Sequence, residues 1–536
     1  MKANFKVGRE RVEVAENVFD KMVRFFDPIK AEKRFKARVT SALVSGYSGG
    51  SKTKRTMSEW AVTGGDSDSD ILPNLQTIRD RSSDLVRNVP IATSAINTAV
   101  TNVIGSGLKL QSRIDRSYLK LDDDQADKWE STVEREFKLW AESKNSDAAR
   151  TVDFYGQQSL AFRSVLERGD IFYLTPEIKR TGAPYTLALQ AIEADRVTNK
   201  DWAADTALLA GGVSVDSYSA PQEYHILKRH PGNAYSSDAE WAIVPAYGSK
   251  SGRRNVLHLF DVTRPGQKRG VPYLAPVMEA LKQLGRYTDA ELMAAVISGM
   301  FTVFIESEGS GLDVLADQVQ SNTDDLSLGN GMVVDLAPGE KVSSANPGRP
   351  NAAFDPFVQA ILRQIGAALE IPFELLIKHF TASYSASKAA FVEAWKFFRM
   401  RRAWMERCFC NPVYELWMDE AVSIGRLSAP GYFNDPMIKK AYLGAMWIGP
   451  GRGLINETAE VKAATERVKE GFSTIAQESA EMSGGDFDTN HRQRVKEDKM
   501  RKKDGLVETP APPVQVVDQP NPEPKEAAKG DSNARN

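Results

Sequence analysis

The chain has very little cysteine. Cys408 and Cys410 are the two cysteines among 536 residues, and a single residue separates them. A disulfide framework is therefore excluded, and a C-x-C pair without a second pair of ligands does not form a structural zinc site. We expect two reduced thiols within a helix.

The chain also lacks an excess of either charge and lacks long apolar runs. Lysine and arginine number 69 against 71 aspartate and glutamate residues, so the formal net charge is -2. This balance excludes a protein that grips nucleic acid through overall basicity. No stretch reaches the roughly 18 apolar residues of a membrane span, and the charged start of the sequence lacks the apolar core of a signal peptide. The sequence predicts a soluble, intracellular protein of several domains that makes no contact with a membrane.

Two catalytic motifs near the N-terminus fail for want of their structural context. Residues 46–50 (GYSGG) match the G-x-S-x-G nucleophile elbow, which requires a preformed sheet before the serine and a helix after it. Here the motif lies in a polar leader. The same segment nearly matches a phosphate loop, but Ser51 replaces the glycine before the lysine. The missing phosphate loop argues against a nucleic-acid motor.

A third motif leaves one enzymatic alternative open. Residues 385–388 (SASK) match S-x-x-K at the predicted start of a helix, although no K-T-G follows. A serine hydrolase would use Ser385 as nucleophile and Lys388 as base. None of the five histidines has metal-ligand spacing, and His258 is predicted to be a satisfied strand residue. We expect no enzyme activity, no metal and no cofactor.

The stretch 354–408 organises the chain as a helix, a loop and a longer basic helix. Asp355 before Pro356 predicts a helix start, and Pro372 predicts its end. The loop 373–384 carries Lys378 and His379, and Ser385 is predicted to cap the second helix. The basic side chains of that helix indicate a device that holds a polyanion nearby. They are Lys388, Lys396, Arg399, Arg401, Arg402 and Arg407.

The flanking segments predict a mixed α+β, multi-domain protein. Helices are expected at 71–86, 90–104, 121–143 and 156–168, followed by short strands between 171 and 260. A long helix from 272 to 300 has apolar residues at steps of three and four, which is typical of a helix packed beside another. The segment 301–305 is predicted as a strand, 311–321 as a helix and 332–336 as another strand. Helices follow residue 412, a tight turn is expected at 446–453, and the segment beyond 483 is predicted to be disordered.

Several segments, in this order and spacing, resemble the lambda-like family of bacteriophage portal proteins. The similarity spans roughly residues 30 to 480. The segments that carry it are 80–88 (DRSSDLVRN), 105–107 (GSG), 264–271 (RPGQKRGV), 362–372 (LRQIGAALEIP), 384–390 (YSASKAA) and 447–452 (WIGPGR).

The resemblance implies a ring-forming subunit with a wing, a two-helix stem, a small α/β clip and a helical crown. A ring of twelve is the usual number. The implied division is a flexible leader 1–70, a wing 71–271, a first stem helix 272–300, a clip 301–352, a second stem helix 353–371, a tunnel loop 372–385, a basic wing helix 386–411, a crown 412–482 and a disordered tail 483–536.

The resemblance also implies a function. Such a ring occupies one capsid vertex of the virion, where double-stranded DNA is packaged and ejected through it. Its partners would be the large terminase subunit, the major capsid and scaffold proteins, and then the head–tail connector, with assembly in the host cytoplasm. The residues implied at the channel are Lys378, His379, Ser383, Tyr384 and Lys388, and those implied at the clip edge strand, for pairing with the next subunit, are Phe301, Val303 and Ile305.

A channel of this kind agrees with the near-zero net charge. DNA must slide through the ring, so no register along it is to be bound tightly, and phosphate contacts without base readout suffice. Repetition of one loop around an axis multiplies a few lysines into a strong local field.

Overall fold

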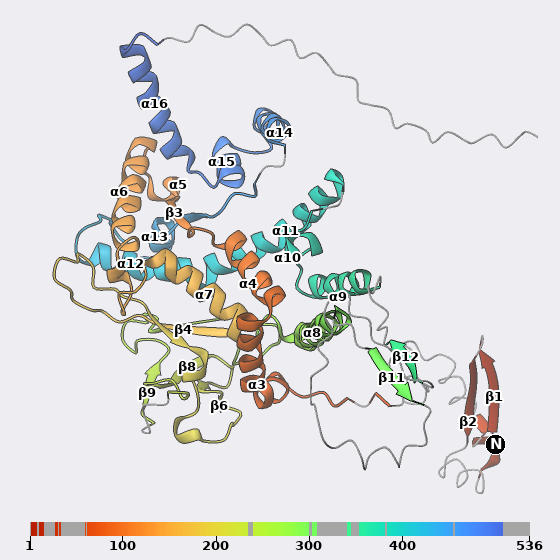
Figure 1. Cartoon of the computed structure of the whole chain (residues 1–536). Helices are drawn as coiled ribbons and strands as arrows, with labels where there is room; N and C mark the ends of the chain where they lie inside the picture. Colours follow the sequence, from red (N-terminus) through yellow and green to blue (C-terminus); the bar gives the residue numbers. More distant parts are fainter. Residues whose placement is uncertain are drawn as a thin grey trace, which may run out of the picture. The chain divides into compact units, whose positions relative to one another are not determined.

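The computed structural model divides the chain into two compact units, Met1–Asp70 and Ile71–Asn536 (Figure 1). Both contain helix or strand, so the chain is a mixed α+β protein. Among the residues described, no helix combines the length and the apolar character that a bilayer span requires. The structure describes residues 2–7, 10–15, 27–30, 32–33, 59–60, 62–233, 239–299, 303–307, 340–344, 353–380, 383–453 and 456–506.

The first unit contains an antiparallel pair of strands, β1 (Lys2–Val7) and β2 (Glu10–Ala15). These residues lie in the segment expected to be a flexible leader, and the sequence predicted no strand there. Apolar residues alternate with polar ones along β1 and around Val12 and Val14 of β2, and Phe5 is in register with Val12. This period of two is the strand pattern, and the high charge of the segment obscured it.

Helices α3 (Ser67–Asn88) and α4 (Pro90–Val103) follow, and α4 begins with proline at its first position. The acidic run before residue 71 was expected to be a break, but its last four residues form the first turn of α3. Asp68 and Asp70 favour this turn because carboxylates interact well with a helix N-terminus.

The next helices are α5 (Arg116–Leu119), α6 (Asp123–Ala141) and α7 (Phe154–Arg168). The expectations for α4, α6 and α7 are confirmed within one or two residues. Asp122 and Gln125 form a capping box at the start of α6. These helices pack around a large aromatic cluster, in which Phe137 meets Trp417 edge to face at 5.1 Å.

Two antiparallel sheets make up the β-rich part. The first has the order β10–β4–β5, with β4 (Asp170–Leu174) in the centre between β10 (Val256–Phe260) and β5 (Gln190–Glu193). Its central strand is buried, and Phe172 joins a smaller apolar cluster shared with the second sheet.

The second sheet has four consecutive strands. The strands that the sequence predicts at 212–215 and 224–227 correspond to β7 and β8. No strand was predicted at 241–245, where the edge strand β9 pairs with β8 from Glu223–Pro245 to Leu227–Trp241. The strands are β6 (Leu209–Ala210), β7 (Val213–Val215), β8 (Pro221–Leu227) and β9 (Trp241–Pro245).

A third pairing joins distant parts of the chain. Strand β3 (Lys109–Ser112) pairs antiparallel with β13 (Ala445–Ile448). The tight turn expected at 446–453 was therefore wrong for residues 446–448. More than 300 residues separate the two strands, so local sequence cannot show this partner.

The long helix after the sheets is α8 (Met278–Gly299), preceded by a 3-10 turn at Ala275–Val277. It lies beside α9 (Phe354–Ala368) (Figure 1). The predicted N-cap at Asp355 was wrong, because the N-cap is Ala353, two residues earlier. Asp355 lies inside α9, where its side chain accepts a hydrogen bond from Gln359. Strands β11 (Val303–Ser307) and β12 (Glu340–Ser344) pair antiparallel. The expected helix 311–321 and strand 332–336 lie outside the described residues.

The segment expected as a loop begins with a helical turn, α10 (Phe373–Ile377). Leu376 is buried there. Helix α11 (Tyr384–Met405) then begins, and Ser383, not the predicted Ser385, is its N-cap. A π-helical turn, Glu406–Cys410, joins α11 to α12 (Asn411–Ser423). Both thiols are free and lie in this turn, as expected.

The C-terminal part is helical. It comprises α13 (Pro436–Tyr442), α14 (Glu457–Lys469), α15 (Ile475–Ser483) and α16 (Phe487–Lys503). The prediction of disorder beyond residue 483 was wrong for α16. A cap at Asp486 and basic residues in the last turn favour this helix, although it has no apolar face to reveal it.

Candidate functional site

The paired helices α8 and α9 contact each other along only part of their length. Leu281 and Leu284 are buried, and Tyr287 packs on Phe354 and Phe357 with ring centroids 5.6 and 5.2 Å apart. Further along, the apolar side chains of α8 face solvent. Leu292 is 65% exposed, Met293 60% and Val296 49%. The apolar stripe read from the sequence is therefore only half covered within one chain.

The segment after α9 presents exposed side chains on a fixed base. Ser94 of α4 donates a hydrogen bond of 2.7 Å to the carbonyl of Leu376, which ties α10 to the helical core. Lys378 ends α10 in the left-handed conformation, with φ of 56°, a conformation that costs a lysine more than a glycine. Lys378, His379 and Phe380 are all exposed. The structure thus places the first two predicted channel residues on one exposed turn.

The other predicted channel residues lie at the start of α11. Ser383 is exposed and accepts a hydrogen bond of 3.4 Å from the amide of Ala386. Tyr384 begins the helix. Lys388 lies 3.8 Å from Glu460 of α14, so part of its charge is matched within the chain. Lys378 and Lys388 therefore differ in their surroundings.

The residues predicted at the clip edge lie partly outside the described residues. Phe301 is not described. Val303 and Ile305 lie in β11, in register with Ser344 and Val342 of β12. The other edge of this two-stranded sheet has no partner strand among the described residues.

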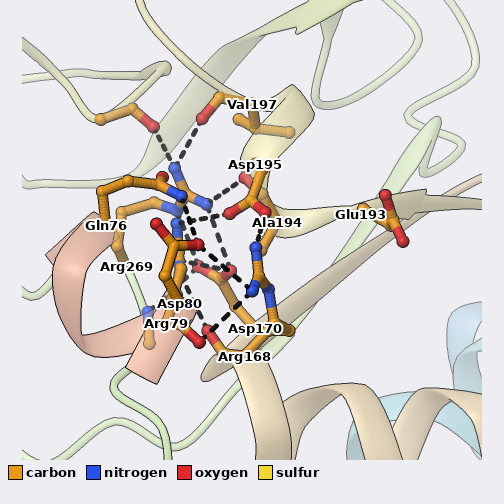
Figure 2. A network of polar contacts seen from close by, with 12 residues as sticks. Gln76, Arg79, Asp80, Arg168, Asp170, Glu193, Ala194, Asp195, Val197 and Arg269 are labelled. Carbon is orange, nitrogen blue, oxygen red and sulfur yellow. Dashed lines mark hydrogen bonds and ion pairs between the residues drawn. The ribbon is translucent and has the colours of Figure 1, made fainter. Parts of the chain in front are cut away.

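Sequence reasoning missed a buried network of three arginines and two aspartates (Figure 2). Asp170 of β4 is its centre. Arg79 of α3 donates to one carboxylate oxygen at 2.7 Å, and Arg269 donates to the other at 2.7 Å. The side chains of Arg79, Arg269 and Asp170 are 3%, 2% and 0% exposed. Arg168 pairs with Asp195, which is also buried.

The network leaves few of its polar groups unsatisfied. Arg269 also donates to the carbonyls of Ala194, Val197 and Gly211 at 2.7, 2.7 and 2.6 Å. The amide of Gly270 donates to Asp170 at 3.1 Å. A side chain on Gly270 would overlap the backbone carbonyl of Gly169, so the glycine permits this close approach.

Burial and charge act against each other in this network. Burial alone would raise the pKa of Asp170, but Arg269 and Arg79 hold it well below its usual value. Burial lowers the pKa of Arg79 to about 9, against the opposing effect of Asp170. The carboxylate therefore stays ionised at neutral pH, as an architectural anchor.

The anchor fixes the route into α8. Arg269 belongs to the segment 264–271, which leads directly into that helix. Just beyond it, the amide of Tyr273 donates to the carbonyl of Leu166 at 2.9 Å. The sequence signal was present in the segment RPGQKRGV, but 99 residues separate Arg269 from Asp170, so the pairing itself was invisible.

The sequence model of one protein family, described as phage portal protein, lambda family, matches residues 53–402. This is well over half of the chain.

The chain belongs to the lambda family of phage portal proteins.

Individual portal proteins agree with this assignment. The chain is 25% identical to portal protein B of Escherichia phage lambda over 488 residues, which cover 86% of this chain and 90% of the relative. It is 25% identical to the portal protein of Escherichia phage N15, covering 83% and 88% of the two chains. The family and the function predicted from the sequence are confirmed, and the comparisons give no support to the serine hydrolase alternative.

Solved structures were also compared. A chain from the neck of a native gene transfer agent particle, computed with C12 symmetry, matches with a TM-score of 0.39 and 13% identity, covering 74% of this chain and 92% of that one. The assignment to the family rests on the sequence matches alone.

Proposed function

We propose that this portal protein assembles into a ring at one capsid vertex.

 A dodecamer is the form expected. The observation that carries the proposal is the exposed apolar face of α8, formed by Leu292, Met293 and Val296. Large exposed apolar side chains gathered on one helix mark an interaction surface. Contacts in a ring are head-to-tail, so a different face of the neighbouring subunit's stem would cover them.

The described elements support the division into portal parts. The helices α3 to α7 and the two β-rich sheets would form the wing, and α8 with α9 the stem. The pair β11 and β12 would belong to the clip, and the helices after residue 412 to the crown. An open edge of the clip sheet would pair with a neighbouring subunit, through Val303 and Ile305, and so close the ring.

The segment 372–385 would line the channel for double-stranded DNA. Its support is the exposed turn that carries Lys378 and His379, held by the buried Leu376. Lysines contact phosphates without reading bases, so a ring of such turns would let DNA of any sequence slide. Lys388 would contribute less because it faces Glu460.

The remaining roles follow from the portal function. The clip would dock the large terminase subunit during packaging and the head–tail connector afterwards, while the major capsid and scaffold proteins would surround the wing. The protein would have no enzymatic activity of its own. It would assemble in the host cytoplasm and remain in the virion.

Ring formation is tested by placing charge on the stem face. The variant L292D/V296D should remain as single chains of 59.2 kDa or small oligomers, whereas the unaltered protein should form rings of about twelve chains in mass photometry and negative-stain microscopy. The matched control is L139D, because Leu139 is a leucine 50% exposed on α6, away from the stem. Rings formed equally by L292D/V296D would overturn the proposed role of this face.

The channel is tested by removing charge from the exposed turn. The variant K378A should shorten the packaged genome or reduce its retention in assembled particles, because each subunit loses one phosphate contact. K440A is the control, since Lys440 is an exposed lysine on α13. Identical packaged length and particle stability for K378A and K440A would remove Lys378 from the channel.

A further inference from the structure

Beyond its first turn, helix α16 has no buried residue. Every residue from 489 to 506 is exposed. The apolar side chains beyond the first turn of the helix are no exception, since Val495 is 39% and Met500 54% exposed. A helix of this kind is not stabilised by burial, so its sequence must serve another purpose.

Four cations form a row along one face of α16. Arg492, Lys496, Lys499 and Lys503 are spaced by four, three and four residues, which places them one above another on a helix. At 1.5 Å per residue the row is about 16 Å long. At 3.6 residues per turn, Glu497 and Asp498 lie about 100° away from the nearest member of the row. We call these four residues the cationic row.

The three lysines of the cationic row make no ion pair in the described part of the chain. Arg492 donates a hydrogen bond of 2.7 Å to the neutral hydroxyl of Ser131, and its charge opposes the rise in the pKa of Glu134. Like charges three and four residues apart destabilise an isolated helix. A bound polyanion would relieve this repulsion.

The first turn of α16 is fixed to the fold, so the cationic row is held in a defined place. Asp486 caps the helix by accepting from the amides of Asp488 and Thr489 at 3.1 and 3.3 Å. Gln111 of β3 donates to Asp486 at 2.8 Å and to Asp488 at 3.2 Å. The cationic row therefore extends from a first helical turn that is bonded to β3.

We propose that the cationic row of α16 binds the phosphate backbone of double-stranded DNA, at a surface separate from the segment 372–385. Duplex DNA carries one negative charge per about 1.7 Å of its axis, which suits a straight row of long basic side chains. Binding is independent of base sequence because the row offers cations and no side chain suited to base-edge readout. An acidic protein is the less suitable partner, since the row has no apolar centre of the kind found in protein interfaces.

The experiment measures binding of the full-length protein to a covalently closed circular duplex. A closed circle cannot be threaded through a channel, so this readout is independent of the proposed ring and of Lys378. The variant K496Q/K499Q should bind about tenfold more weakly near physiological salt, and the slope of log affinity against log salt should fall by about two. The matched control is R494Q/K502Q, which removes the same charge from the same helix but outside the row.

The outcomes are distinct. A clear loss for K496Q/K499Q with a small loss for R494Q/K502Q supports the cationic row. Equal losses for the two variants, or no loss for either, overturn it. Binding of polyglutamate in preference to the circle also overturns it, in favour of an acidic protein. Circular dichroism of both variants checks that the helix is retained, which glutamine favours.

Discussion

The buried network around Asp170 and the exposed cationic row of α16 use the same kinds of charge for opposite purposes. In the network, the guanidinium groups of Arg79 and Arg269 are enclosed and bonded, and Asp170 receives donors from both and from a backbone amide. In the row, the lysines are exposed and make no ion pair within the described residues. Buried charges must be matched inside the chain, because leaving one unmatched is costly. Exposed charges carry no such requirement and remain available to a partner.

The largest effect on stability is expected from a substitution in the buried network. Asp170→Asn leaves Arg79 and Arg269 enclosed without a counter-charge, which should cost about 3–5 kcal/mol of stability. Urea unfolding monitored by tryptophan fluorescence measures it. Asp80→Asn is the control, because Asp80 is 62% exposed and lies 3.6 Å from Arg168, so it should change stability by less than about 1 kcal/mol. Equal effects of the two substitutions would contradict the architectural role of Asp170.

The same variant, Asp170→Asn, should also change how the stability of the protein depends on pH. The pKa of Asp170 is held below its unfolded value, so its stabilising contribution is present above about pH 4 and is lost as the pH falls through the folded-state pKa. Asp170→Asn should remove this part of the acid sensitivity. The unfolding midpoints of Asp170→Asn and of the unaltered protein should therefore converge as the pH is lowered from 7.

A smaller effect on stability is expected from Glu134, which lies near Asp486 at the start of α16. Burial raises the pKa of Glu134 to about 7, and Asp486 and Glu130 add to the shift. Because the folded-state pKa lies above the unfolded one, the contribution is fully present below the unfolded value and is lost as the pH rises through about 7. Glu134→Gln keeps an acceptor for the amide of Ser112, so it should flatten the decline in melting temperature between pH 5 and pH 8, by a few degrees. An unchanged decline would show that Glu134 does not titrate in this range.

The smallest effect on stability is expected from the exposed side. K496Q/K499Q should change the free energy of unfolding by no more than about 0.5 kcal/mol, because neither lysine is buried or paired. Chemical denaturation beside the unaltered protein measures it. A large destabilisation would mean that the cationic row stabilises the fold, as the buried network does, and would contradict the difference between the two regions.

Elements with a strong local signal were predictable, and elements that depend on distant partners were not. The apolar residues at helical spacing through Phe137 revealed α6. Strand β13 has no comparable signal because its partner, β3, lies more than 300 residues away. Helix α16 was missed for a different reason, since a helix exposed on all sides has no apolar periodicity.

The candidate surfaces, the apolar face of α8 and the cations Lys378 and Lys388, were likewise predictable only in part. The sequence showed the apolar stripe of α8, but only the structure shows that the stripe is buried at Leu281 and exposed at Leu292. It showed Lys378 and Lys388 as nearby cations, but not that Lys388 faces Glu460. Periodicity reports which side chains share a helix face, and it does not report what covers that face.

By itself, the sequence determined the family, the mixed α+β class and most helices, because ordered motifs, caps and apolar spacing are local properties. The tertiary structure alone decided which charges are enclosed and which are free. That distinction depends on residues far apart in the chain: Asp170 meets Arg79 and Arg269 across about 90 to 100 residues, and only folding brings them together.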